Sequence, residues 1–274
     1  MTTTSSGAAD RITARDARML RLIAEHRVLT SSQLTTAFFN HSSKARLRIG
    51  ILREAELIET FRPPGGDSVL HCVATAKALK LLGVSRSAMP PAGKTQAATA
   101  AALRPDLGHL RGVNEFFCQL IARSRRIRGA ALEEWRSEWT TAALFPARVR
   151  PDGFARWRVG EQWCEFFFEY DTGSEPLHRL VAKLNGYDDL MHTADTCCPV
   201  LFWLPNARRE QHVHQALGAA NAEVPFATAA GDPEQADVAG SVWRPVFADR
   251  RLTLAELGAA ACAHLGVPHQ PHAL

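Results

Sequence analysis

Residues 150–187 read RPDGFARWRVGEQWCEFFFEYDTGSEPLHRLVAKLNGY, and the rest of the chain is interpreted outward from them. Their pattern predicts a strand that carries Asp152, a turn at Gly160 and Glu161, and an apolar strand over residues 163–170. A helix is expected to follow. This strand–strand–helix segment predicts the centre of a sheet domain.

The apolar strand ends in two carboxylates, Glu169 and Asp171. Because residues two apart on a strand point to the same face, both side chains are expected to project together. Grouped carboxylates are suitable ligands for a hard cation. On the helix that follows, Lys183 and Tyr187 lie one turn apart and can reach back to the carboxylates.

The helix itself is expected to be capped by Ser174, with Pro176 in its first turn. Its apolar residues recur at helical spacing and are expected to face the sheet: Leu177, Leu180, Val181, Leu184 and Met191.

An acid, two strands, an acid pair and a helix with a lysine together resemble the PD-(D/E)XK nuclease-like core. Pro151 and Asp152 match the PD motif, and Glu169 matches the second acid. The resemblance implies a magnesium site at Asp152, Glu169 and Asp171, where the ion activates water and stabilises charge on the scissile phosphate. In that family a lysine stands two residues after the second acid. Here Asp171 occupies that position, and Lys183 is interpreted as the relocated lysine.

A second interpretation of the same residues stays open. Asp152 can be an ordinary turn residue, and Glu169 and Asp171 can be acids that close a strand before a helix, because the motif is short and degenerate.

The length of the chain suits two domains, and its composition is that of a folded protein. The chain has 274 residues, of which 46% are hydrophobic and 22% charged. It contains no apolar run long enough to span a bilayer, and its first residues lack the features of a signal peptide, so a cytoplasmic location is expected. There is no CxxC pair, so buried thiols are expected rather than zinc ligands or disulfides. The six cysteines are Cys72, Cys118, Cys164, Cys197, Cys198 and Cys262.

The charge is unevenly distributed along the chain. Residues 1–130 contain 20 Lys and Arg against 9 Asp and Glu, a net +11, and residues 131–274 contain 12 against 19, a net −7. Basic side chains bind phosphates with release of counterions, so the amino-terminal half is the expected contact for a polyanion.

This half is predicted to begin with three capped helices. Thr13 with Asp16 can cap the first helix, and Thr30 with Gln33 forms a capping box for the second. Ser42 or Ser43 is expected to cap a third helix that extends to residue 56. Its apolar residues at one-turn intervals, Leu47, Ile51 and Ala55, are expected to form its buried side.

Two strands, over residues 57–62 and 68–73, are predicted to form a hairpin after the third helix. Three helices and a hairpin indicate a winged helix-turn-helix, a fold that places its third helix in the major groove of DNA. The expected DNA contacts are Lys44, Arg46, Arg48 and Arg53 on that helix, and Arg62 at the wing. Two other interpretations stay open: the basic residues can merely solvate an outer face, or the fold can contact protein instead.

Further elements follow the periodicity of the remaining sequence. A closing helix is expected at residues 75–82, a linker at 84–105, helices at 109–128, 208–219 and 252–265, and strands at 132–139, 199–204 and 224–229. The fold class is therefore α+β with α/β character. A winged helix-turn-helix at residues 11–83 precedes a mixed-sheet, restriction-endonuclease-like domain at 106–265, with disordered ends at 1–10 and 266–274.

The order of motifs resembles the actinobacterial replication-relaxation proteins over about residues 11–260. The matching features are the basic winged helix, the helix with His109 and Asn114, the PDG at Pro151, residues 169–175, the helix with Lys183 and Tyr187, and the SVWRP segment at 241–245. The likeness implies a plasmid or mobile-element context and a double-stranded DNA partner.

The leading hypothesis is a DNA-binding protein whose winged helix delivers a nuclease-like domain to DNA, with magnesium-dependent cleavage. The alternative is a regulator or replication accessory that does not cleave DNA and whose second domain contacts replication or conjugation proteins. A protein that binds no DNA is a third hypothesis. A homodimer is compatible with each of them.

Overall fold

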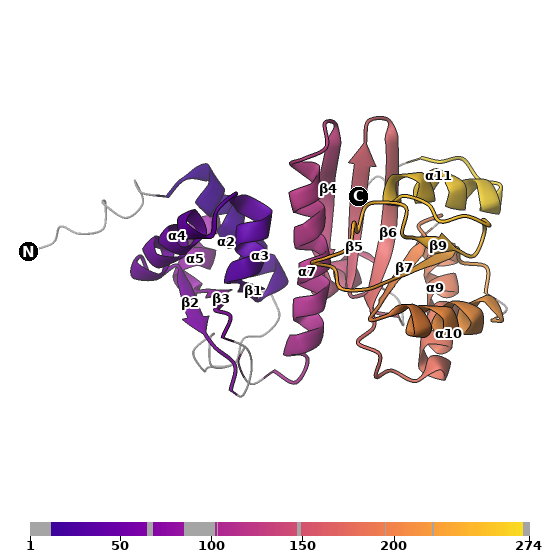
Figure 1. Cartoon of the computed structure of the whole chain (residues 1–274), viewed down its shortest axis with the longest axis horizontal. Coiled ribbons are helices and arrows are strands. Elements are labelled where there is room, and N and C mark those ends of the chain that lie inside the picture. Colours follow the sequence, from indigo (N-terminus) through magenta and orange to yellow (C-terminus); the bar gives the residue numbers. More distant parts are fainter. Residues whose placement is uncertain are drawn as a thin grey trace, which may run out of the picture. The chain divides into compact units, whose positions relative to one another are not determined.

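The computed structural model describes residues 12–64, 68–84, 102, 104–146, 149–194, 196–220 and 222–270 (Figure 1). The chain divides into two compact units, Met1–Asn114 and Glu115–Leu274. Within the described residues, no helix combines the length and the apolar character needed to cross a lipid bilayer. The predicted disordered start at residues 1–10 lies outside the described part of the chain.

The first unit contains the helices α2 (Ala14–His26), α3 (Ser31–Phe38), α4 (Ser42–Glu54) and α5 (Ala76–Leu82). Two of the predicted caps are confirmed, because Thr13 and Thr30 both form capping boxes with the residue three positions on. The predicted cap of α4 is wrong. Its N-cap is His41, which makes no side-chain capping bond, so Ser42 and Ser43 lie inside the helix.

A three-stranded antiparallel sheet completes the first unit. The strands are β1 (Leu29–Thr30), β2 (Ile58–Phe61) and β3 (His71–Ala74), in the order β1-β3-β2. The two predicted hairpin strands are present, although shorter than expected. The short strand β1 was not predicted, because two residues carry no periodicity of their own.

The buried face of α4 differs from the prediction. Ala45, Ile49 and Leu52 are buried, whereas Leu47 is 65% exposed. Both sets of residues have helical spacing, so periodicity alone could not choose between them. The structure buries the stripe that contains Ala45, and Leu47 lies on the opposite side of the helix.

Helix α7 (Leu107–Ser124) contains the boundary between the units. In the first unit, Leu107 and Leu110 pack with Val28 and Val73, and Asn114 Nδ2 donates a hydrogen bond to the carbonyl oxygen of Val28 at 2.7 Å. The first unit therefore extends into α7, beyond the predicted linker at residues 84–105. Most of that linker lies outside the described residues.

The second unit is built on a six-stranded sheet in the order β4-β5-β6-β7-β8-β9. Strands β4 to β6 are antiparallel, β6 to β8 are parallel, and β9 is antiparallel again. Their bounds are Ala130–Ser137, Gly153–Val159, Gln162–Tyr170, Val200–Leu204, Phe226–Ala230 and Arg244–Pro245. The sheet is therefore mixed, as predicted. Trp139 does not continue β4, because Ser137 caps a short helix, α8 (Glu138–Leu144), that was not predicted.

Helices cover both faces of this sheet (Figure 1). On one face, Phe116 of α7 stacks on Phe168 of β6, with 4.2 Å between the ring centroids. On the other, α9 (Leu177–Ala194) and α10 (Ala207–Gly218) bury side chains such as Leu184 and Val213 against the strands. Ser174 does not cap α9. The helix begins at Leu177, and the Ser174 hydroxyl is hydrogen bonded to that of Thr172 instead.

Helix α11 (Leu254–Leu265) packs closely against β6. A Cβ atom added at Gly258 would lie 2.4 Å from the Trp163 carbonyl oxygen, so only glycine permits this approach. A disulfide joins Cys197, just before β7, to Cys262 of α11. The expectation of six free thiols is therefore wrong for this pair. The contact that brings the two residues together is tertiary and leaves no spacing motif in the sequence.

The segment that follows α11 also differs from the prediction. Disorder was predicted for 266–274, but the structure describes residues 266–270, and the His269 ring stacks on Trp163 with 3.7 Å between centroids. Residues 271–274 lie outside the described part.

Candidate functional site

The pairing of β5 with β6 brings Asp152 next to Glu169. In this antiparallel ladder Gly153 is opposite Phe168. Asp152, just before β5, and Glu169 of β6 are therefore the next residues beyond this pair. Asp152 is held there because its Oδ2 accepts a hydrogen bond from the backbone N–H of Tyr170 at 2.8 Å. Two residues that are 17 positions apart in the sequence thus lie next to each other where β5 begins and β6 ends.

Glu169 is only 2% exposed, and both of its carboxylate oxygens have donors. Lys183 Nζ donates to Oε2 at 2.9 Å, and the Tyr187 hydroxyl donates to Oε1 at 2.5 Å. Burial and, second, the negative charge of Asp152 raise the pKa of Glu169 to about 7. The site therefore contains more negative charge than its buried position readily tolerates.

Lys183 is the shared partner of two acids. Besides Glu169, it pairs with Glu175, with 3.1 Å between Nζ and Oε2. Burial lowers the pKa of Lys183, but the charge and hydrogen bond of Glu169 raise it by more, and the net shift is upward. Its ammonium group therefore remains protonated at neutral pH. Burial and Glu169 also raise the pKa of Tyr187 well above its ordinary value, so its hydroxyl remains a donor.

Asp171 forms an ion pair with Arg209 rather than with Lys183. Its Oδ2 accepts a hydrogen bond from Arg209 Nε of α10 at 2.6 Å, and its Oδ1 accepts one from the Gly173 N–H at 2.7 Å. Arg209 also donates to the backbone oxygen of Glu175. The structure thus brings Asp152, Glu169 and Lys183 together and holds Asp171 in a separate ion pair. Sequence reasoning missed Arg209, because nothing in its helix marks it as a partner of the acid pair.

A groove of about 590 Å³ lies beside Lys183. Lys183 lines it together with Arg150 and Arg179, which are both exposed, and with the acids Glu175 and Asp189. Three cations in an open groove next to a carboxylate pair can bind the phosphates of a nucleic acid strand.

Two carboxylates and a groove match part of what a magnesium site requires. Asp152 and Glu169 supply hard oxygen atoms, and their mutual repulsion would be relieved by a divalent cation. Asp171 does not fit as a third ligand, because Arg209 neutralises it. Among the described residues, no group of three or more His, Cys, Asp or Glu side chains is placed to share one metal ion.

In the first unit, the predicted DNA contacts differ in their surroundings. Lys44, Arg46 and Arg53 are exposed on α4. Arg48 instead forms an ion pair with Asp16 of α2, whose carboxylate is fully buried, with 3.0 Å from Nε to Oδ1. Arg62 is exposed and donates from Nε to the backbone oxygen of Ser68 across the hairpin at 3.0 Å. We therefore place Arg48 within the fold rather than on the outer surface of α4.

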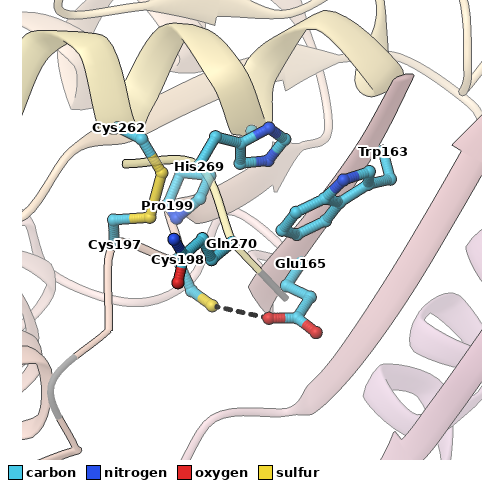
Figure 2. A pocket seen from close by; sticks show the side chains of 9 residues that line it. Trp163, Glu165, Cys197, Cys198, Pro199, Cys262, His269 and Gln270 are labelled. Atoms are coloured by element: carbon cyan, nitrogen blue, oxygen red, sulfur yellow. Dashed lines mark hydrogen bonds between the residues drawn. A yellow bond between two sulfur atoms is a disulfide. The ribbon is translucent and has the colours of Figure 1, made fainter. Parts of the chain in front are cut away.

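A second, much smaller hollow lies between β6 and the end of the chain (Figure 2). With about 10 Å³ of free space, it has room for at most one water molecule. Figure 2 shows the His269 ring beside Trp163 and the Cys198 sulfur directed at Glu165. Burial raises the pKa of the Cys198 thiol above its ordinary range, so this thiol is a poor nucleophile. The hollow is part of the packing of α11.

These observations define the class of protein, an α+β protein of two units. One is a small unit of helices and a three-stranded sheet, with an exposed basic helix. The other is a mixed sheet with a carboxylate–lysine cluster where β5 begins and β6 ends. Residues 20–202 match the model of the replication-relaxation family. The chain belongs to this family. No curated protein and no solved structure matches it.

Proposed function

We propose that this chain is a DNA-binding protein of plasmid or mobile-element replication or relaxation. In this proposal the first unit is a winged helix-turn-helix that brings a nuclease-like second unit to duplex DNA. The observation that carries it is the outer surface of α4, where Lys44, Arg46 and Arg53 are exposed on the helix that follows the α2–α3 pair. Membership of the replication-relaxation family is consistent with a DNA partner.

The salt dependence of DNA affinity tests this proposal. Each basic side chain that neutralises a phosphate contributes about 0.9 to the slope of log K against log salt. The triple change Lys44→Ala, Arg46→Ala and Arg53→Ala is expected to reduce the slope by up to about 3. Lys80→Ala is the matched control, because Lys80 is exposed on α5 of the same unit. An unchanged slope in the triple variant contradicts the assignment to α4.

For the second unit, we propose metal-dependent cleavage of a phosphodiester bond. Asp152 and Glu169 would hold a magnesium ion, which when bound would activate water and stabilise charge on the scissile phosphate. Tyr187 fixes the orientation of Glu169 through its hydrogen bond, and the Tyr170 N–H fixes Asp152. Lys183 supplies a positive charge beside the reacting phosphate. Arg150 and Arg179 hold the neighbouring phosphates of the strand in the groove.

A second candidate is supported by a specific observation: both oxygens of Glu169 already have protein donors, and Asp171 is paired with Arg209. In this proposal the second unit is inactive in cleavage and serves as a platform for replication or conjugation proteins. Lys183 then has a structural role, neutralising Glu169 and Glu175.

A nicking assay on supercoiled plasmid distinguishes the two. In the first case the wild type converts supercoiled plasmid to the open circle with magnesium, and Asp152→Asn loses at least about a hundredfold in rate, a typical cost of removing a charge-stabilising group. The matched control is Asp189→Asn, because Asp189 is exposed in the same groove outside the carboxylate pair. If the wild type binds the plasmid but does not nick it, the platform function replaces the nuclease function.

A further inference from the structure

Leu47 is the most exposed large hydrophobic residue in the described part of the chain, at 65%. It lies on α4, opposite the buried residues Ala45, Ile49 and Leu52. At this exposure most of the side chain lies outside the packed interior, so burial gives no reason for a leucine at this position. A single exposed leucine is common, so this observation needs a second one.

Gly50 supplies the second observation. It lies three residues after Leu47 on the same side of α4, because residues three and four apart are neighbours on a helix. A Cβ atom added at Gly50 would meet nothing within 4 Å, and its backbone is not in the left-handed region. Glycine in a helix interior is less favourable than alanine. Among the residues that the structure describes, no packing contact explains a glycine at position 50, where helix propensity favours alanine.

Basic residues border this surface. Lys44 lies on one side of the Leu47 and Gly50 positions, and Arg46 and Arg53 lie on the other, all exposed. The one acid on the same side of the helix, Glu54, is the last residue of α4. A surface with an apolar centre, a missing side chain and a cationic border is complementary to the major groove. There, thymine presents a methyl group between two rows of phosphates.

We infer that Leu47 and Gly50 determine the DNA sequence preference of this protein. Leu47 contacts the methyl group of a thymine, and the absence of a side chain at Gly50 lets the α4 backbone approach the base edges. The flanking Lys44, Arg46 and Arg53 contact phosphates. The inference rests on the proposed DNA-binding function and goes beyond it, since it assigns the base contact to two residues that carry no charge.

The experiment begins with selection of the preferred duplex from a random library by the wild-type protein. Each thymine of the selected site is then replaced in turn by uracil, which removes the methyl group and leaves every hydrogen-bonding group in place. At one thymine the wild type is expected to lose about fivefold to tenfold in affinity, within the range of a single base-pair mismatch. Leu47→Ala should bind the thymine and uracil duplexes equally.

Gly50→Ala separates a DNA contact from a structural role. Alanine favours the helix, so the midpoint of thermal unfolding should rise by about 2 to 4 °C. Affinity for the selected site should nevertheless fall by about tenfold or more, while affinity for unrelated DNA stays within about twofold of the wild type. A purely structural glycine cannot produce a more stable protein that binds its site less tightly.

The matched controls are Leu81→Ala, a second exposed leucine of the first unit, and Gly108→Ala, a helical glycine that likewise meets nothing within 4 Å. Neither should change site affinity. If the wild type binds no DNA, the proposed function itself fails. If it binds DNA but shows no sequence preference, or if the Leu47 and Gly50 variants keep wild-type affinity and thymine discrimination, the inference is overturned and a protein partner becomes the occupant of this surface.

Discussion

The ionisation of Glu169 is strongly altered by its surroundings. Burial and the neighbouring Asp152 charge raise its pKa from 4.5 to about 7, although Lys183 and Tyr187 both donate to it. The folded protein therefore keeps a proton on Glu169 at pH values where the unfolded chain has lost it. This difference links the carboxylate cluster to the stability of the second unit.

We predict that the contribution of Glu169 to the free energy of unfolding falls as pH rises from about 4.5 to about 7. Between these values Glu169 holds its proton in the folded state and has lost it in the unfolded state, so at this residue each increase in pH favours unfolding. The total loss is on the order of 3 kcal/mol. Denaturant unfolding of the wild type and of Glu169→Gln, with chelator present, measures it. The difference between the two proteins should change over this window, and a constant difference would show that Glu169 titrates normally.

Magnesium or manganese is predicted to raise the thermal stability of the wild type. A cation at Asp152 and Glu169 would relieve their repulsion and bind the folded state preferentially, with about 2.7 kcal/mol of stabilisation at a hundred times the dissociation constant. The double variant Asp152→Asn and Glu169→Gln should show no metal-dependent shift in differential scanning fluorimetry. Asp189→Asn should keep the full shift. Equal shifts in the wild type and the double variant would contradict the proposed ligands.

Arg48 illustrates how a basic residue can stabilise the fold itself. Burial alone would raise the pKa of Asp16, but hydrogen bonds from Arg48 and Thr13 outweigh it and hold the pKa below its ordinary value. We predict that Arg48→Ala destabilises the first unit by about 2 to 3 kcal/mol, because it leaves a buried carboxylate without its charged donor. Chemical denaturation measures this, with the exposed Arg46→Ala as control. If both variants unfold like the wild type, the ion pair contributes nothing to stability.

The sequence allowed some residues of the candidate site to be selected, but it did not allow all of their ion-pair partners to be predicted. Asp152, Glu169 and Lys183 could be selected because acids at a strand end and a lysine one element later form a known pattern. The pairing of Asp171 with Arg209 could not be predicted. It depends on the parallel placement of β7 beside β6, which brings the start of α10 next to the end of β6.

Among the elements, α4 and α11 show two limits of periodicity. The sequence of α4 contains two apolar stripes, and only packing against the rest of the first unit decides that Ala45, Ile49 and Leu52 are buried. Helix α11 was predicted nearly to its correct bounds. Its disulfide and its close approach to β6 depend on contacts between segments far apart in the chain, which local patterns do not encode.

We predict that Gly258→Ala disturbs the packing of α11 on β6. The new methyl group would collide with the Trp163 carbonyl oxygen at 2.4 Å, and this backbone atom cannot move aside as a flexible side chain can. The expected destabilisation is about 3 kcal/mol, at the upper end of the usual range for overpacking. Gly108→Ala, in open space on α7, should be neutral or stabilising. Thermal unfolding compares the two, and equal midpoints would refute this account of Gly258.

For the whole molecule, the sequence-based prediction and the structure differ in where the first unit ends. Composition indicated a linker at residues 84–105, and a domain boundary there is the natural sequence-based prediction. The structure adds the start of α7 to the first unit through Leu107, Leu110 and Asn114. The amphipathic pattern of that helix is continuous, so it contains no sign that its two ends belong to different units.

A fragment of residues 1–114 is therefore predicted to be more stable than one of residues 1–105. The shorter fragment loses the burial of two leucines, the hydrogen bond from Asn114 to Val28, and the bond from Gln33 Nε2 to the Arg111 oxygen at 2.9 Å. Together these contribute about 4 kcal/mol. Circular dichroism during thermal unfolding measures the difference. Equal stability of the two fragments would place the boundary in the linker after all.

The disulfide between Cys197 and Cys262 also matters when the chain is pulled from its ends. The two cysteines are 65 positions apart, so the segment between them is a closed loop that tension cannot straighten. In a force–extension measurement, that loop would hide roughly 230 Å of contour length, at about 3.6 Å per residue. The hidden length would appear only after reduction. An unfoldase that threads the chain from its carboxyl end would meet the cross-link at Cys262 as soon as the last turn of α11 unravels, and would have to pass more than one strand of polypeptide at once.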